Sequence, residues 1–236
     1  VPKNDEFFSE FAFPDRLNTI TNFSGSAGFA IISQSTNYLF VDGRYLIQSK
    51  MESGNYFKVV EIPYTYPKDI LKSNRYKNIG YDPKLFTSSS LKKYFENKYR
   101  LIPIKKNLID EIFFEKEKKK NFFFKIGEKV AGEGVTSKIN RLCKILKKNK
   151  SNSIFISAPE NVAWLLNIRG KDNPNSPIPN ARLIIDKEKN VYFFSDQKKI
   201  KKIKYKINYK KIQFYSFENF YNVLSKLNSS FFAIDK

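Results

Sequence analysis

The sequence FAIISQSTNYLFVDGRYLIQSKM, residues 29–51, shows most clearly how the chain alternates its elements. Residues 29–32 and 38–41 are short apolar runs separated by a polar turn, which is typical of two buried strands. Asp-Gly-Arg closes the second run, and residues 45–51 then carry apolar side chains at helical spacing. A strand, a tight glycine turn and a helix in succession indicate an α/β layer.

The pattern continues toward the C-terminus. A charge run, FFEKEKKKN at 113–121, interrupts the apolar periodicity, so we expect an interdomain linker over residues 113–127. Before it, strands are predicted at 56–62, 79–83 and 101–104, and helices are predicted to open at Pro67 and at Ser88 as N-cap. After it, helices are predicted at 137–148, 162–166 and 217–227, and strands at 154–156, 182–185, 191–194 and 231–234.

The second half thus repeats the plan of the first. We predict the α/β class with two similar domains, residues 1–112 and 128–236, each a mixed β-sheet flanked by helices. The lysine-rich tract at 198–211 alternates with Ile and Tyr and is interpreted as a solvated face.

Composition narrows the environment of the protein. Hydrophobic residues make up 41 % of the chain, which is enough for packed cores. The apolar runs are too short to cross a bilayer, and no signal-peptide pattern opens the sequence. A single cysteine, Cys143, cannot form an internal disulfide, so we expect a structural role for it and a reducing, cytoplasmic location without a membrane partner.

The net charge of +20 is unevenly spread. Residues 1–112 hold 16 basic and 12 acidic residues, whereas residues 113–236 hold 27 and 11. Two explanations are open: a surface for a polyanion, or A/T-rich codons that favour Lys, Asn, Ile, Phe and Tyr. Because only seven of the basic residues are Arg, we favour codon usage and expect no nucleic-acid partner.

Two absences constrain the chemistry. The sequence contains no histidine, which excludes an imidazole base or a histidine metal ligand within this chain. The only methionine is Met51, so we expect that the chain begins downstream of its natural start and is a fragment.

Four stretches, in this order and spacing, resemble the N-terminal regions of the aminopeptidase P family of Xaa-Pro aminopeptidases. They are VPKNDEFFSEF (1–11), RLNTITNFSGSAGFAII (16–32), LFVDGRYLIQSK (39–50) and APENVAWLLNIRGKDNPNSPIPNARLII (158–185). The segments IGYDPKLF (79–86) and NLIDEIF (107–113) also resemble linking segments of that family. The resemblance therefore extends over essentially the whole chain.

The resemblance implies two creatinase-type N-terminal domains, the first lacking its opening helix, that shape the substrate entrance of a metallopeptidase. The family's C-terminal "pita-bread" domain binds two divalent metals, usually manganese, and removes an N-terminal residue that precedes proline. We therefore expect no catalytic residue, metal or cofactor in this chain and no activity of its own. Its expected partners are the catalytic domain, short proline-containing peptides and a second copy in a homodimer.

Four residues are the candidate site residues that the resemblance suggests. Arg44, with Asp42, matches a family position that binds the peptide substrate; the alternative is that Arg44 forms a salt bridge with Asp42 or Asp82. Trp164 and Arg169 would face the catalytic domain. The sequence itself favours core packing for Trp164, and helix capping, with Gly170 at the C′ position, is as consistent with Arg169-Gly170.

The loop at residues 24–28 has two interpretations, a tight turn or a lining of the active-site mouth, and the turn is favoured because glycines permit close backbone approach. For the whole chain, the alternative function is a non-catalytic binding module of the pita-bread type for basic protein or nucleic-acid partners. An RNA-associated protein is a weaker interpretation, because the sequence carries no aromatic-basic RNA-binding signature.

Overall fold

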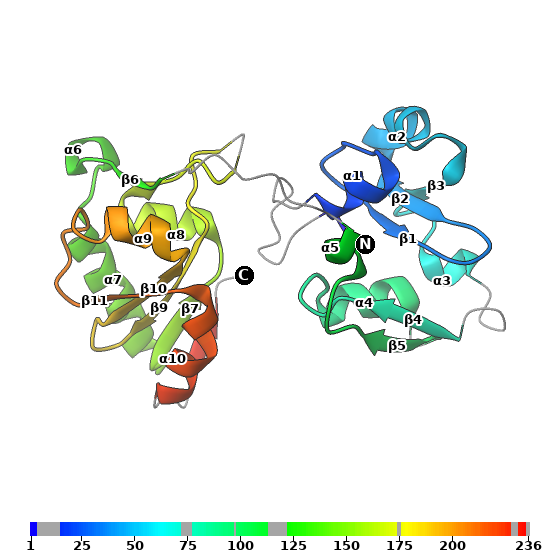
Figure 1. Cartoon of the computed structure of the whole chain (residues 1–236). Coiled ribbons are helices and arrows are strands. Elements are labelled where there is room, and N and C mark those ends of the chain that lie inside the picture. Colours follow the sequence, from blue (N-terminus) through cyan, green and yellow to red (C-terminus); the bar gives the residue numbers. More distant parts are fainter. Residues whose placement is uncertain are drawn as a thin grey trace. The chain divides into compact units, whose positions relative to one another are not determined.

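The computed structural model describes residues 1–3, 15–71, 77–96, 98–112, 122–173, 176–227 and 231–234, and the chain divides into two units, Val1–Lys118 and Lys119–Lys236 (Figure 1). Both units are α/β structures in which helices flank β-sheets, so the predicted fold class is confirmed. Of the expected linker, residues 113–121 lie outside the described residues, and residues 122–127 belong to the second unit.

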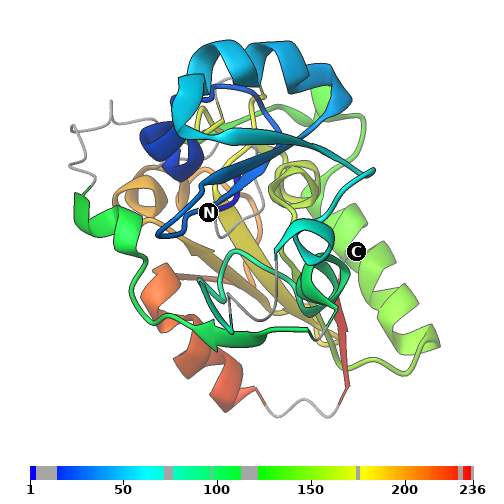
Figure 2. The same cartoon turned by 90° about the vertical axis from the view of Figure 1, so that its right-hand side faces the viewer.

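The first unit is built on short strands and short helices (Figure 2). In chain order its elements are α1 (Arg16–Thr21), β1 (Phe29–Ile31), β2 (Tyr38–Asp42), the 3-10 turn η1 (Gly43–Tyr45), α2 (Leu46–Ser53), the 3-10 turn η2 (Gly54–Tyr56), β3 (Lys58–Ile62), α3 (Pro67–Ile70), β4 (Asn78–Tyr81), α4 (Ser88–Phe95), β5 (Arg100–Pro103) and α5 (Leu108–Ile112). Strand β2 is central, antiparallel to β1 and parallel to β3, while β4 and β5 form a separate parallel ladder.

Side-chain alternation along β2 produces two cores in this unit. Leu39 and Val41 pack on one face with residues of α1 and α2. Phe40 lies on the other face, where its ring stacks on Phe29, and Phe29 stacks in turn on Tyr94 of α4, each at 4.6 Å between centroids. Because successive side chains of a strand point to opposite faces, the continuous apolar run of β2 lies between two helical layers.

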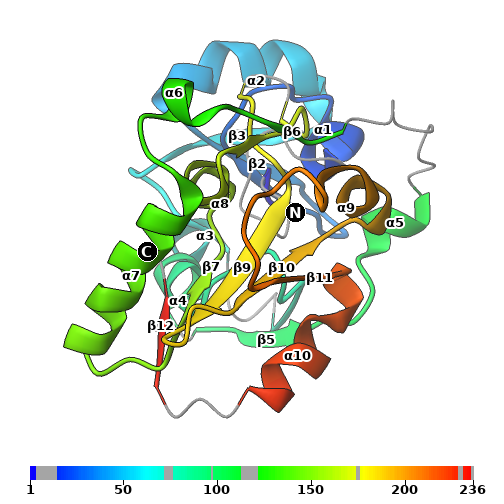
Figure 3. The ribbon, with the colours of Figure 1, turned by 90° about the vertical axis from the view of Figure 1, so that its left-hand side faces the viewer.

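The second unit contains a five-stranded sheet in the order β11-β10-β9-β7-β12 (Figure 3). Its elements are β6 (Phe124–Lys125), α6 (Glu128–Ala131), α7 (Val135–Lys148), β7 (Ser153–Ile156), α8 (Pro159–Leu166), β8 (Ile168–Arg169), β9 (Ala181–Asp186), β10 (Val191–Ser195), α9 (Gln197–Ile203), β11 (Ile212–Tyr215), the 3-10 turn η3 (Phe217–Asn219), α10 (Phe220–Lys226) and β12 (Phe232–Ile234). The sheet is mixed: β9 is antiparallel to β7 and β10, whereas the outer strands β11 and β12 are parallel to their neighbours.

Helices cover both faces of this sheet. Helices α7, α8 and α9 pack on the face that carries Leu183, Ile185 and Phe193, and α10 packs on the face that carries Ile184 and Phe194. Cys143 of α7 is buried in the first of these clusters, in agreement with the structural role predicted for it. No helix in the described ranges combines the length and apolarity that a membrane span requires.

The structure differs from the sequence-based expectations at three places. Helix α1 was not predicted, because six residues are too few to show a helical period. Helix α4 does start at Ser88, but its N-cap is Thr87, whose hydroxyl accepts a hydrogen bond from Ser90 N. The lysine-rich tract is more than a solvated face, since α9 and the residues after it bury Ile200, Ile203 and Ile207.

Candidate functional site

Strand β2 of the first unit ends in a turn that fixes the backbone around Asp42 and Arg44. The Asp42 carboxylate oxygen Oδ1 accepts a hydrogen bond from Arg44 N at 3.0 Å, which satisfies an amide at the start of η1. Gly43 suits the turn because a Cβ atom there would lie 2.9 Å from Glu61 Oε1 of the neighbouring strand. The sequence Asp-Gly-Arg therefore places Arg44 immediately beyond the carboxyl end of a parallel pair of strands.

The guanidinium of Arg44 forms a bidentate pair with Asp42. Arg44 Nε donates to Asp42 Oδ1 at 3.0 Å and Nη2 donates to Oδ2 at 2.6 Å. The hydrogen bond from Arg44 lowers the pKa of the Asp42 carboxyl below its ordinary value. The Arg44 side chain is nevertheless 70 % exposed and that of Asp42 29 % exposed, so the pair lies at the surface.

Between the two salt bridges considered for Arg44, the structure shows the one with Asp42. Asp82 is engaged elsewhere, since its carboxylate accepts a hydrogen bond from Asn107 Nδ2 at 2.9 Å. The two candidate substrate-binding residues therefore act as one group, in which Asp42 orients the guanidinium of Arg44. This geometry is compatible with a substrate role, because the pair is not buried.

The loop at residues 24–28 packs beside the Arg44 turn. Tyr45, next to Arg44, shares a hydrogen bond of 2.7 Å with Ser26 Oγ, and its ring meets Phe23 edge-on at 5.6 Å. Glu52, two turns further along, accepts hydrogen bonds from Ser24 N and Oγ at 2.7 and 2.8 Å. The sequence analysis singled out the loop at 24–28 and the Asp-Gly-Arg turn, but not the residues Tyr45 and Glu52 that join them. The seven-residue spacing of Tyr45 and Glu52, which suits one helical face, could have indicated this contact.

Helix α8 of the second unit carries Trp164 on its outer side, and the prediction that Trp164 packs in the core was wrong. Val162, Leu165 and Leu166 occupy the buried face of the helix, and this leaves the indole 48 % exposed. Two cations contact the indole ring: Lys138 Nζ lies 4.4 Å and Arg141 Cζ 5.6 Å from its centroid. Trp164 is thus a surface aromatic with an ordered position.

Lys138 of α7 was not predicted as a site residue. Its side chain is only 2 % exposed, and its ammonium donates to Trp164 O and to Asn167 Oδ1, both at 2.7 Å. Burial lowers the pKa of Lys138, while the nearby Glu133 carboxylate acts in the opposite direction. Its spacing was the available signal, because Lys138 lies three residues after Val135 and four before Leu142 and so borders the apolar stripe of α7.

Arg169 caps the helix that carries Trp164. Its Nη1 donates to Ala163 O at 3.0 Å and to Ile168 O at 2.8 Å, so the capping interpretation of Arg169 is realised by its side chain. The residue in the left-handed conformation is the C-cap Asn167, with a φ of 52°, and Gly170 is not the C′ residue that we predicted. Gly170 is needed for packing instead, because a Cβ atom would lie 2.8 Å from Pro179 Cα.

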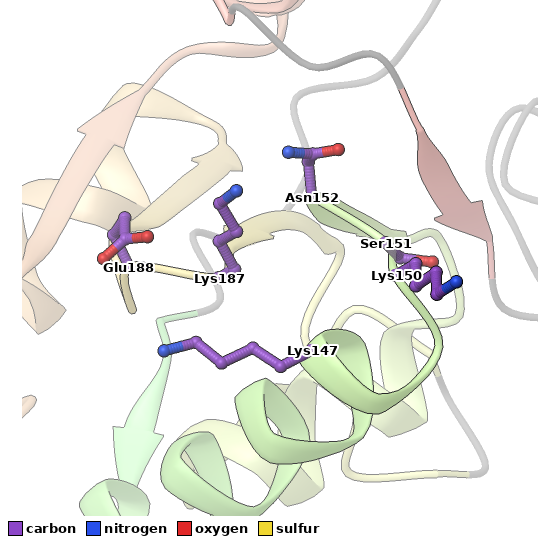
Figure 4. A pocket seen from close by; sticks show the side chains of 6 residues that line it. All are labelled: Lys147, Lys150, Ser151, Asn152, Lys187 and Glu188. Atoms are coloured by element: carbon purple, nitrogen blue, oxygen red, sulfur yellow. The ribbon is translucent and has the colours of Figure 1, made fainter.

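The part of the chain that the structure describes offers no metal centre. No group of three or more His, Cys, Asp or Glu side chains gathers there. It does contain two surface hollows of about 280 and 330 Å³, the first next to the Arg16–Asp110 ion pair and the second at the end of α7 (Figure 4). None of the four candidate site residues lines either hollow.

Both units are similar to domains of known proteins. Residues 12–112 and residues 115–236 each match the Creatinase/Prolidase N-terminal domain family. A probable Xaa-Pro aminopeptidase P of Laccaria bicolor is 33 % identical over 208 residues, which cover 82 % of this chain and 32 % of the relative. Aminopeptidase P1 of Lotus japonicus is 29 % identical, covering 85 % of this chain and 32 % of the relative.

A solved structure shows the same fold. The crystal structure of an X-prolyl aminopeptidase from Caenorhabditis elegans, a cytosolic enzyme with a di-nuclear active site, matches with a TM-score of 0.80 at 23 % identity. The match covers 95 % of this chain and 39 % of that protein. This chain therefore spans about a third of the length of the curated relatives that it matches.

Proposed function

Since the chain belongs to the Creatinase/Prolidase N-terminal domain family, we propose that it forms the two non-catalytic N-terminal domains of a metal-dependent Xaa-Pro aminopeptidase. Such an enzyme is a hydrolase that removes the first residue of a peptide whose second residue is proline. Support comes from relatives described as Xaa-Pro aminopeptidases, which are similar to this chain over about a third of their length. The proposed domains are residues 1–112 and 128–236.

The observation that carries the proposal is the exposed Arg44 held by Asp42 at the end of β2. A guanidinium offers planar N–H donors that suit the carbonyl or carboxylate oxygens of a short peptide. Asp42 fixes this long side chain before any substrate arrives, which reduces the entropy that binding would otherwise cost. In this proposal the first domain lines the substrate entrance, with Arg44 as its direct contact and Asp42 as the residue that orients it.

The second domain contributes a contact with the catalytic domain through Trp164 and Arg169. A half-exposed tryptophan held by neighbouring cations has the character of an interface anchor. Arg169 helps to position Trp164, since its hydrogen bond to Ala163 O fixes the end of α8.

The remaining parts of the proposal concern the longer protein. Two divalent ions, which we expect to be manganese, would be held by residues outside this chain, because the described residues do not fit such a site. When bound, they would supply the activated water for peptide hydrolysis. We also propose a cytoplasmic location and a homodimer.

The test is Arg44→Ala in the longer aminopeptidase, assayed with short Xaa-Pro peptides. We expect kcat/KM to fall by the equivalent of about 1–3 kcal/mol, the usual range for a hydrogen bond to a charged group. Arg100→Ala, at an exposed position in β5, is the matched control and should leave kcat/KM unchanged. A variant Arg44→Ala with normal kinetics and a sharply lower melting temperature would make the residue structural.

A further inference from the structure

A tract after strand β10 of the second unit is unusually rich in lysine. Residues 197–217 include eight lysines and no acidic residue. The isoleucines of α9 and of the following loop face the core, and the lysines between them are left outside. The exposed members are Lys198, Lys201, Lys202, Lys204, Lys206, Lys210 and Lys211.

Two hydrogen bonds attach this tract to the turn between β9 and β10. Tyr209 OH donates to Lys189 O at 2.8 Å, and Lys211 Nζ donates to Glu188 O at 3.1 Å. The turn itself contributes Lys187 and Lys189, so the basic tract continues across it toward α7.

Beyond the turn lies the hollow of about 330 Å³ at the end of α7. Figure 4 shows Lys147 extending from the last turn of α7 and Lys187 from the β9–β10 turn, with Glu188 beside Lys187. The lining residues are Lys147, Lys150, Ser151, Asn152, Lys187 and Glu188. We call these lysines, with Lys189 and the exposed lysines of the tract, the lysine surface.

The ammonium groups of the hollow are not used up by the protein itself. Within the described ranges, Lys147, Lys150 and Lys187 take part in none of the ion pairs. The end of α7 does not need them as caps, because its last carbonyls accept backbone hydrogen bonds. These bonds run from Asn149 N to Ile145 O, from Ser151 N to Leu146 O and from Lys150 N to Lys147 O. The positive charge of the hollow is therefore available to a ligand.

We propose that the lysine surface binds the phosphodiester backbone of a nucleic acid without reading its bases. Codon usage, the explanation favoured from the sequence, would account for the number of lysines in the chain but not for the absence of acidic residues from residues 197–217. Lysine acts as a point charge for phosphate, whereas the arginine forks that read bases are absent from the lysine surface. Tyr205, 84 % exposed between two lysines, offers a ring on which a base can stack.

An anionic membrane fits the same surface less well. A helix that lies on a membrane inserts its apolar face, and the apolar residues of α9 are already buried in the protein core. The occupant with the right chemistry is thus a flexible chain of phosphates with stackable bases.

The experiment is a fluorescence-anisotropy titration of the chain with a labelled oligo(U) of about 20 nucleotides, longer than the usual footprint of one single-strand site. We expect log K to fall linearly with log salt, with a slope near −3 if about four phosphates are neutralised. The combined substitutions Lys147→Glu, Lys150→Glu and Lys187→Glu should lower the affinity at least about tenfold. Glu188→Gln should raise it, because it removes a negative charge from the hollow.

The matched control reverses three exposed lysines of the first unit, Lys50, Lys58 and Lys92, and so changes the net charge equally. It should change the affinity by less than about twofold. An equal loss in both triple variants would reduce the effect to net charge and overturn the proposal. So would the absence of binding at low salt, or equally tight binding of polyglutamate or phosphatidylserine vesicles. Should the charge-reversal variant misfold by circular dichroism, the triple Lys→Gln variant replaces it, with a loss of at least about threefold expected.

Discussion

The ammonium group of Lys138 is buried inside the second unit. A buried charge is stable only if protein groups replace the hydrogen bonds that it would form with water. The replacement consists of two oxygen acceptors and the face of an indole ring. Both acceptors belong to the end of α8, so Lys138 joins α7 to the segment that carries Trp164. Its role is therefore to order Trp164 as well as to stabilise the unit.

The first prediction concerns removal of this ammonium. Lys138→Met should lower the free energy of unfolding by about 1–3 kcal/mol, because Asn167 Oδ1 and Trp164 O lose a buried donor. Lys144→Met changes the same residue type at an exposed position of the same helix and should stay within about 0.5 kcal/mol. Urea unfolding followed by the fluorescence of the single tryptophan measures both. An unchanged variant would show that water satisfies the two oxygens.

The pH dependence of stability provides a second prediction. The pKa of Lys138 is lower in the folded chain than its ordinary value of 10.5. Between these two values the unfolded chain binds more protons, so the free energy of unfolding should rise with pH in that window. The rise attributable to Lys138 should vanish in Lys138→Met, which urea titrations from pH 7 upward would detect. Parallel curves for the two proteins would contradict the assignment.

A third prediction concerns Asp42. Because the hydrogen bond from Arg44 is the main cause of its lowered pKa, Arg44→Ala should raise the pKa of Asp42 toward its ordinary value of 3.8. The sign follows from linkage: the pair stabilises the fold above the unfolded pKa, and that contribution is lost as pH falls through the folded pKa. Carboxyl NMR titration measures the change, with Arg100→Ala as control. An unshifted Asp42 would mean that the pair does not persist in solution.

For single residues, the sequence predicted where a side chain lies in the fold better than it predicted which residue that side chain contacts. A strand followed by Asp-Gly-Arg was enough to place Arg44 at a strand end, but its pairing with Asp42 depended on the local turn. The exposure of Trp164 could not be predicted, because residues 162–166 are all apolar and only the packing of α8 decides which of its faces meets the sheet.

At the scale of elements, the end of α8 illustrates how tightly a short connection can be packed. Gly170→Ala should destabilise the second unit by about 1–3 kcal/mol, because the added methyl meets the backbone of Ile178 and Pro179 at less than 3.0 Å. Gly127→Ala adds the same methyl where no atom lies within 4 Å and should stay within about 0.5 kcal/mol. Thermal unfolding compares the two; equal melting temperatures would show that the loop relaxes easily.

Element predictions succeeded where an apolar run or a helical period could be recognised and failed where elements were very short. Strand β2 is a continuous apolar run and helix α7 shows a clear period of 3.6, and both were predicted close to their observed bounds. The strands β6 and β8 have two residues each and are too short to show a period. They form because Phe124 pairs with Arg169, which lies far away in the sequence. Pairing between residues so far apart in the sequence cannot be predicted from the local sequence pattern.

For the whole molecule we expect no metal-dependent activity from this chain alone. Calorimetry with manganese or zinc should show no stoichiometric binding in the micromolar range, because the sequence has no histidine and the described carboxylates do not cluster. Xaa-Pro peptides should likewise remain intact. Tight metal binding or turnover above background would place a catalytic centre within these residues and refute the division of labour proposed above.

The strand order of the second unit has a consequence for synthesis. Strand β7 is an inner strand of the finished sheet, but its neighbour β12 follows it by some 76 residues, from Ile156 to Phe232. At translation rates of about 5–20 residues per second, one edge of β7 waits about 4–15 s for its partner. During that interval the unpaired edge of β7 in the nascent chain can pair with a strand of another polypeptide. This risk of misassembly ends only when β12 has left the ribosome and pairs with β7.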